Sequence, residues 1–153
     1  MSTRGAIAYA TGDGFRGVYH RWDSYPSGLG ATLWERAHKT EDLGIMLHDL
    51  IENHPAGFST IIREQECYCH SLGKEEPWEV TEKNAAGSGV EYVYAFDVVS
   101  RTMSILSSYT TYEGCEVKMI GMFGMGDPDA TWRAITILDL DGPEPDWEAL
   151  GEA

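Results

Sequence analysis

Alternating apolar and polar residues near the start of the chain predict a β-hairpin. Residues 4–10 are mainly small and apolar, and residues 15–22 alternate large side chains with charged ones. Between them, residues 11–14 read Thr-Gly-Asp-Gly, and an Asp-Gly pair flanked by such runs is a strong hairpin signal. Because side chains alternate along a strand, Tyr19 and His20 are expected to point to opposite faces of the second strand.

Two helices are predicted next, because apolar residues recur every three or four positions. The first is expected over about 28–39, with the Ser27 hydroxyl as its N-terminal cap, and the second from a cap at Thr40 to about Asn53. Pro55 disfavours a helical conformation at the residue before it and so limits the second helix. The apolar stripes consist of Leu29, Leu33 and Ala37 in the first helix and of Leu43, Leu47, Leu50 and Ile51 in the second.

The rest of the chain reads mainly as strands separated by polar and glycine-rich turns. Tyr92, Tyr94 and Phe96 alternate with Val93 and Ala95, a pattern that is typical of a half-buried strand. The expected strands are residues 58–62, 66–70, 90–99, 103–109, 117–123 and 131–140, with a turn over residues 124–129.

Several short strands and two early helices indicate an α+β fold. We expect a mainly antiparallel sheet opened by a β-hairpin, with two consecutive helices packed on one face. A chain of 153 residues is long enough for one ordinary hydrophobic core. We therefore expect a single domain over residues 1–142, followed by an acidic, solvated and partly disordered tail over residues 143–153.

Acidic residues dominate the charge, since 25 Asp and Glu residues stand against 11 Lys and Arg residues, for a net charge of −14. This excess repels nucleic-acid backbones and anionic lipids, so neither nucleic acid nor a membrane is expected as a direct partner. The charge serves solubility alone, or it lets the protein dock onto a basic surface of another protein. The chain has no apolar run near the roughly 20 residues that cross a bilayer and begins without a signal-peptide pattern, so we expect a cytoplasmic location.

The sequence contains three cysteines, Cys67, Cys69 and Cys115, an odd number that does not suit a disulfide framework. Cys67, Cys69 and His70 lie close together, but Cys-x-Cys is shorter than the usual spacing of zinc ligands. In the expected strand over 66–70, the two cysteines share one face and His70 points to the other. We therefore assign no metal ligand and no cofactor, and the sequence leaves metal binding by these three residues open.

Residues 18–30 hold the densest group of polar and aromatic side chains, at the expected junction between the hairpin and the first helix. His20 and Asp23 are candidate catalytic residues, because a turn can bring an imidazole and a carboxylate into contact for acid–base chemistry. The candidate binding residues are Tyr19, Arg21, Trp22, Ser24, Tyr25, Ser27 and Gly28. The same residue types also suit a purely structural turn, and they suit a site for a small molecule or a peptide anion.

The same segment, together with Thr3-Arg4-Gly5 at the start of the first strand, resembles a known group of proteins. Residues 19–30 read YHRWDSYPSGLG, which is similar to small uncharacterised proteins encoded by bacteriophages and mobile elements, chiefly of actinobacteria and other Gram-positive hosts. The resemblance is clearest over residues 3–34 and continues weakly through residues 91–97. It implies an accessory phage function in the cytoplasm of a host cell, without a defined activity.

Two functions from different classes are compatible with these features. The first is an acidic binding or regulatory domain that engages a host or phage protein. The second is a small hydrolase or transferase that uses His20 and Asp23, with Tyr25 and Arg21 holding a small-molecule substrate. The sequence leaves open which of the two applies, and it leaves the oligomeric state open.

Overall fold

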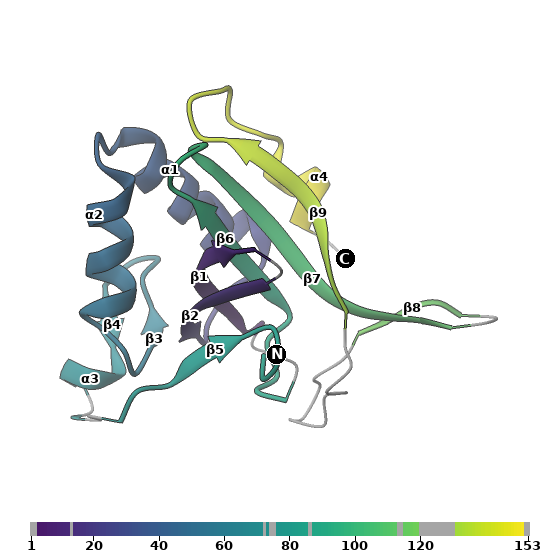
Figure 1. The fold of residues 1–153 in the computed structure, drawn as a ribbon, viewed down its shortest axis with the longest axis horizontal. Coiled ribbons are helices and arrows are strands. Elements are labelled where there is room, and N and C mark those ends of the chain that lie inside the picture. Colours follow the sequence, from purple (N-terminus) through teal and green to yellow (C-terminus); the bar gives the residue numbers. More distant parts are fainter. Residues whose placement is uncertain are drawn as a thin grey trace.

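A computed structural model describes residues 3–12, 14–71, 73, 76–85, 87–112, 115–119 and 131–151. Within these ranges, nine strands form one mixed sheet, and helices cover one of its faces (Figure 1). The structure confirms the α+β class, the mostly antiparallel sheet and the hairpin at the start of the chain.

The opening hairpin consists of β1 (Gly5–Thr11) and β2 (Gly14–His20), which pair antiparallel along their whole length. β1 pairs on its other edge with β6 (Tyr92–Asp97), and this pairing is parallel. β2 pairs with β3 (Phe58–Thr60) in parallel as well. The hairpin therefore lies in the middle of the sheet, and the sheet is mixed rather than purely antiparallel.

The other strands extend the sheet in both directions from the hairpin. They are β4 (Glu66–Cys67), β5 (Glu79–Thr81), β7 (Thr102–Tyr112), β8 (Cys115–Met119) and β9 (Thr131–Asp139). The strand order is β4-β3-β2-β1-β6-β7-β8, with β5 paired to β2 and β9 paired to β7 (Figure 1). β5 was not expected from the sequence, β8 starts earlier than predicted, and the expected turn over 124–129 lies outside the described residues.

The helical segments are shorter and more mixed in type than expected. A π-helical turn η1 (Pro26–Gly30) leads into α1 (Ala31–Lys39), and α2 (Leu43–Leu47) leads into a second π-helical turn, η2 (His48–Glu52). The last two helices are α3 (Tyr68–Ser71) and α4 (Trp147–Gly151). In the described part of the chain, no helix is long and apolar enough to span a bilayer.

Both expected helix caps are wrong. The first helical segment starts at Pro26, one residue before Ser27, and no side chain caps it. Proline is favoured at a first helical position because its missing N–H has no intrahelical partner there. At the second helix the cap is Asp42 rather than Thr40, since the Asp42 carboxylate accepts the Ile45 N–H at 3.0 Å.

The central strands are buried on both faces. Ile7 and the expected aromatic face of β6 pack against the apolar stripes of the helices. On the opposite face, a second cluster contains Tyr19 and Val93, together with Val80 from β5. The expectation of a half-buried strand over 90–99 is therefore wrong, because β5 and the residues after it add apolar side chains to the second face.

The acidic C-terminal stretch is more ordered than expected. α4 lies against η1, and the Trp147 ring meets the Trp34 ring edge to face, with centroids 6.4 Å apart. The Trp147 indole N–H donates to the Glu144 carboxylate at 2.9 Å. A stretch expected to be solvated thus contains a helix that packs on the core, while its acidic side chains stay exposed.

We predict that Gly17→Ala destabilises the protein strongly. A Cβ at Gly17 would collide with the backbone of β1, lying 2.5 Å from Ala8 Cα. Since neither strand can move without breaking the hairpin, we expect the free energy of unfolding to fall by about 3 kcal/mol in chemical denaturation. Gly87→Ala is the control, because a Cβ there meets its nearest neighbour, Asn84 O, at an ordinary 3.6 Å. Equal effects of the two substitutions would contradict this prediction.

Candidate metal centre

The structure buries His20 completely, at the end of β2. Its Nε2 accepts the Ile61 N–H at 3.1 Å, and its Nδ1 lies 2.9 Å from Ser24 Oγ. Because Nε2 acts as an acceptor, Nδ1 carries the proton and donates to Ser24, whose hydroxyl donates to the His20 carbonyl at 3.1 Å. Burial lowers the pKa of His20 to about 3, so the ring is neutral at physiological pH.

Asp23 lies apart from this arrangement. It is exposed, its backbone adopts a left-handed conformation with φ of 56°, and its carbonyl accepts the Leu29 N–H at 3.0 Å. In the described residues, no hydrogen bond or ion pair joins its carboxylate to His20. The catalytic pairing of His20 with Asp23 stays a prediction, and this geometry does not favour it.

The structure brings only some of the candidate binding residues together. Ser24 bonds to His20, Arg21 lies over the Trp22 ring at 4.9 Å, and the Gly28 N–H donates to the Tyr25 carbonyl at 2.9 Å. Tyr19 points to the other face of the sheet and stacks on Trp78 at 4.2 Å, which confirms that Tyr19 and His20 face opposite ways. Ser27 is exposed.

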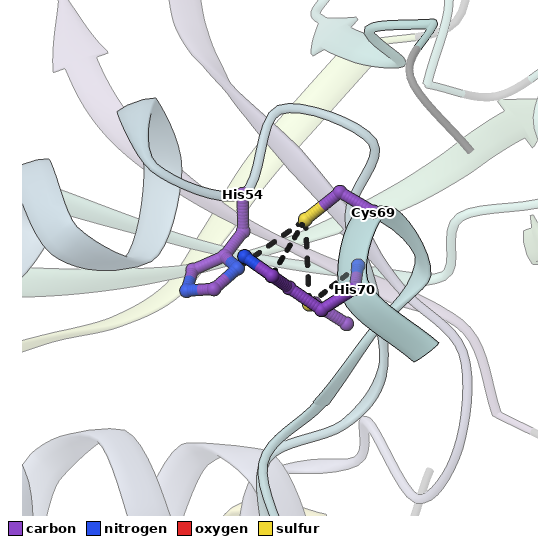
Figure 2. Close-up of side chains that lie close together, drawn as sticks. His54, Cys69 and His70 are labelled. Carbon is purple, nitrogen blue, oxygen red and sulfur yellow. Dashed lines mark hydrogen bonds between the residues drawn. The ribbon is translucent and has the colours of Figure 1, made fainter. Parts of the chain in front are cut away.

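A different group of side chains converges beyond β3, at the edge of the sheet. His54, Cys67, Cys69 and His70 each offer one nitrogen or sulfur atom, and these four atoms lie within 4.8 Å of one another. Figure 2 shows the Cys69 sulfur pointing toward the neighbouring rings of His54 and His70.

The spacing of these atoms is close to that of a tetrahedral metal site. Cys67 Sγ lies 2.9 Å from His70 Nδ1, Cys69 Sγ lies 3.4 Å from His54 Nδ1, and the two sulfurs are 3.3 Å apart. With Zn–S bonds of about 2.3 Å and Zn–N bonds of about 2.0 Å, the edges of a tetrahedron measure about 3.3–3.8 Å. The Cys67–His70 pair is shorter than such an edge and other pairs lie up to 4.8 Å apart, so shifts of up to about 1 Å would place a zinc ion between the four donors.

A tight turn positions His54. Its carbonyl accepts the Gly57 N–H at 2.9 Å, and Pro55 occupies the second position of this turn, where its fixed φ is favoured. Gly57 has a φ of +90°, and a Cβ on it would come within 2.7 Å of Tyr19 O. The sequence His-Pro-Ala-Gly thus fixes the backbone of His54 directly before β3.

The pairing of β3 with β4 brings the cysteines to this turn. Phe58 is paired with Cys67, and the Gly57 carbonyl accepts the Tyr68 N–H at 2.9 Å. The expected strand over 66–70 is wrong beyond Cys67, because the chain turns into α3 at Tyr68. In the expected strand, His70 would point away from the two cysteines. The turn into α3 instead places His70 beside both of them.

The electrostatics favour the metal-binding form of Cys67 and of His54, but not that of Cys69. Burial raises the pKa of Cys67, but hydrogen bonds from Cys69 and His70 outweigh burial, so the pKa of Cys67 lies below its usual range. Burial and the neighbouring Cys67 raise the pKa of Cys69. Burial is the main cause of a lowered pKa of His54, and the charge of His70 is the second cause. A neutral His54 ring keeps a nitrogen lone pair free for a metal. The backbone N–H of His70 also donates to Cys67 Sγ at 3.3 Å, which stabilises a thiolate at Cys67.

A cysteine nucleophile paired with a histidine is the alternative chemistry of this cluster. Cys67, which lies nearest to a histidine nitrogen, is only 4% exposed and belongs to the hydrophobic core. A substrate cannot reach such a sulfur without displacing core residues. For Cys67, the arrangement therefore favours metal coordination over covalent catalysis.

Sequence reasoning missed His54 as a partner of the Cys-x-Cys-His segment. Twelve residues separate His54 from Cys67, and a gap of about a dozen residues between two ligand groups is common in zinc sites. This gap was the sequence signal that could have identified His54 as the fourth ligand. Comparison of the chain with protein-family models, with curated proteins and with solved structures gave no significant match.

We predict that His20 makes the protein less stable in acid. The unfolded chain takes up a proton on His20 near pH 6.5, whereas the folded chain resists protonation until pH about 3. The contribution of His20 to the free energy of unfolding is therefore complete above pH 6.5 and is lost progressively as the pH falls toward 3. Between pH 5 and 6, the free energy of unfolding should fall up to about 1.4 kcal/mol per pH unit more steeply in the native chain than in His20→Gln.

Chemical denaturation at the two pH values measures this slope, and His48→Gln, at an exposed position, is the control. NMR gives an independent measurement if His20→Gln does not fold, because the His20 ring of the native chain should keep neutral-imidazole shifts down to pH 4. A ring that titrates near pH 6 would contradict the assignment.

Proposed function

We propose that this chain is a zinc-binding domain in which the ion has a structural role. The observation that carries the proposal is the convergence of four donor atoms, from His54, Cys67, Cys69 and His70, within 4.8 Å. These residues come from two separate segments of the chain. A metal bound between them would fasten β4 and α3 to the turn before β3.

The donor types favour zinc among the abundant divalent ions. Two sulfurs and two imidazole nitrogens are soft or borderline ligands, which suit zinc and do not suit magnesium or calcium. Two thiolates also neutralise the charge of Zn²⁺. A neutral centre is appropriate here because Cys67 is buried and two of the other ligands are half-buried.

A structural role follows from the number of ligands. Four protein ligands complete a tetrahedral zinc shell and leave no open position for a substrate or a reactive water molecule. β4 has two residues and α3 has four, and elements of this length are not stable on their own. The ion would supply the local stability that such short elements lack.

A complete metal shell and a buried, fully bonded His20 favour a binding protein over a hydrolase or transferase. The acidic character of the chain supports a basic protein surface as its partner, because the net charge is −14. The chain carries no Lys or Arg after Arg133, and the acidic side chains of this part, such as Glu144 and Glu148, are exposed. The phage-like sequence features make a host or phage protein the expected source of that surface.

We predict that the purified chain binds one zinc ion with a dissociation constant on the order of 10⁻⁹ M or lower. Bound Co²⁺ should show thiolate charge-transfer bands and the visible bands of a tetrahedral site. His54→Ala and Cys69→Ser should each weaken binding by more than about 100-fold, since loss of a ligand exceeds the typical effect of an outer-sphere change.

Matched controls test whether these losses are specific. His48→Ala removes an exposed histidine six residues before His54, and Cys115→Ser removes the third cysteine. Both should keep the affinity of the native chain. A chain that binds no metal, or variants that bind as the native chain does, would rule out the zinc proposal.

We also expect the native chain to retain a basic protein from a Gram-positive host lysate at low salt and to release it at high salt. Salt screens contacts between exposed charges over a Debye length of about 10 Å at 0.1 M, so charge-driven binding weakens as salt is added. Affinity capture followed by identification of the retained proteins measures this. Retention that does not change with salt, or no retention at low salt, would contradict an acidic docking surface.

A further inference from the structure

Gln65 lies between His54 and helix α1, on the far side of His54 from the cysteines. The Gln65 amide nitrogen is 3.3 Å from His54 Nε2. On its other side, the Gln65 amide oxygen accepts a hydrogen bond from Arg36 NH1 at 3.3 Å. The Arg36 guanidinium is itself fixed, because its NH2 donates to the Ile61 carbonyl at 3.3 Å.

The two ring nitrogens of His54 have different roles in a metal centre. Nδ1 faces the sulfur of Cys69, so this atom is the one available to a metal. Once Nδ1 gives its lone pair to the ion, Nε2 must carry the proton and needs an acceptor. Metal-bound histidines almost always donate this second N–H to a carboxylate, a carbonyl or water, which fixes the ring and raises its basicity.

We propose that Gln65 is the positioning residue of the zinc centre and accepts the His54 Nε2–H through its amide oxygen. This inference rests on the proposed zinc site and adds the group that orients one of its ligands. A rotation of the Gln65 amide exchanges its oxygen and nitrogen, so that the oxygen accepts the His54 Nε2–H and the bond from Arg36 NH1 is given up. Arg36 keeps its bond to the Ile61 carbonyl.

Two substitutions at Gln65 separate this role from simple packing. Gln65→Ala removes the acceptor and should weaken zinc binding by about 10-fold to 100-fold, measured by competition with a chelator. Gln65→Glu supplies a carboxylate that can only accept, so it should bind zinc at least as tightly as the native chain. Gln65 is exposed, so both variants are expected to fold.

Arg63→Gln is the charge control, since it makes the net charge more negative by one, as Gln65→Glu does, at an exposed neighbouring position. It should leave the zinc affinity within about twofold of the native value, whereas ligand orientation affects affinity by 10-fold or more. NMR of the zinc-loaded chains supplies a second readout. The His54 Nε2–H should exchange slowly with water in the native chain and in Gln65→Glu, and rapidly in Gln65→Ala.

The outcomes distinguish this inference from the zinc proposal itself. A native chain that binds one zinc ion, together with a Gln65→Ala variant of equal affinity and equal His54 Nε2–H exchange, would overturn the role of Gln65 and leave the zinc site intact. A Gln65→Glu variant that binds as weakly as Gln65→Ala would also overturn it. A native chain that binds no zinc removes both.

Discussion

The arrangement of this molecule depends on the backbone pairing of the short strand β3. On one edge, β3 accepts hydrogen bonds from the end of the hairpin, because the Arg21 N–H donates to the Phe58 carbonyl and the Trp22 N–H donates to the Ser59 carbonyl, both at 3.1 Å. On its other edge, β3 pairs with β4 and so brings Cys67 to the turn that holds His54. Three residues of strand therefore join the junction of the hairpin to the candidate metal centre.

Two kinds of polar group hold this region together. His20 is buried, neutral and bonded at both ring nitrogens, so it links the end of β2 to the segment after β3 without a buried charge. Of the donors of the metal cluster, Cys67 is buried and the other three are partly or fully exposed, and the four are joined to one another by short contacts. Such contacts between thiols and imidazoles are weak in water, and a shared metal ion would replace them with four strong bonds.

Several elements could be predicted from the sequence because local patterns determine them. The Asp-Gly turn and the flanking alternation predict the hairpin of β1 and β2, and the alternation of Tyr92 to Phe96 predicts β6 and its two faces. That both faces of β6 are buried could not be predicted, because the second apolar layer comes from residues distant in the sequence, such as Val80.

The metal cluster could be predicted only in part, for the same reason. Cys67, Cys69 and His70 are visible as neighbours, but a strand pattern separates them, and only the turn into α3 brings them together. His54 joins them through the β3–β4 pairing, which no local pattern specifies. Within the polar segment 18–30, His20 and Ser24 are buried and bonded to each other, whereas Trp22, Asp23 and Ser27 are exposed, so its role as a binding site stays a prediction.

In the proposed zinc centre, the four side chains bind one metal ion together. X-ray absorption at the zinc edge of the zinc-loaded chain measures the ligands of the ion directly. Coordination by His54, Cys67, Cys69 and His70 predicts a shell of two sulfurs at about 2.3 Å and two nitrogens at about 2.0–2.1 Å. A shell of oxygen and nitrogen alone, or a shell with fewer than two sulfurs, would contradict it.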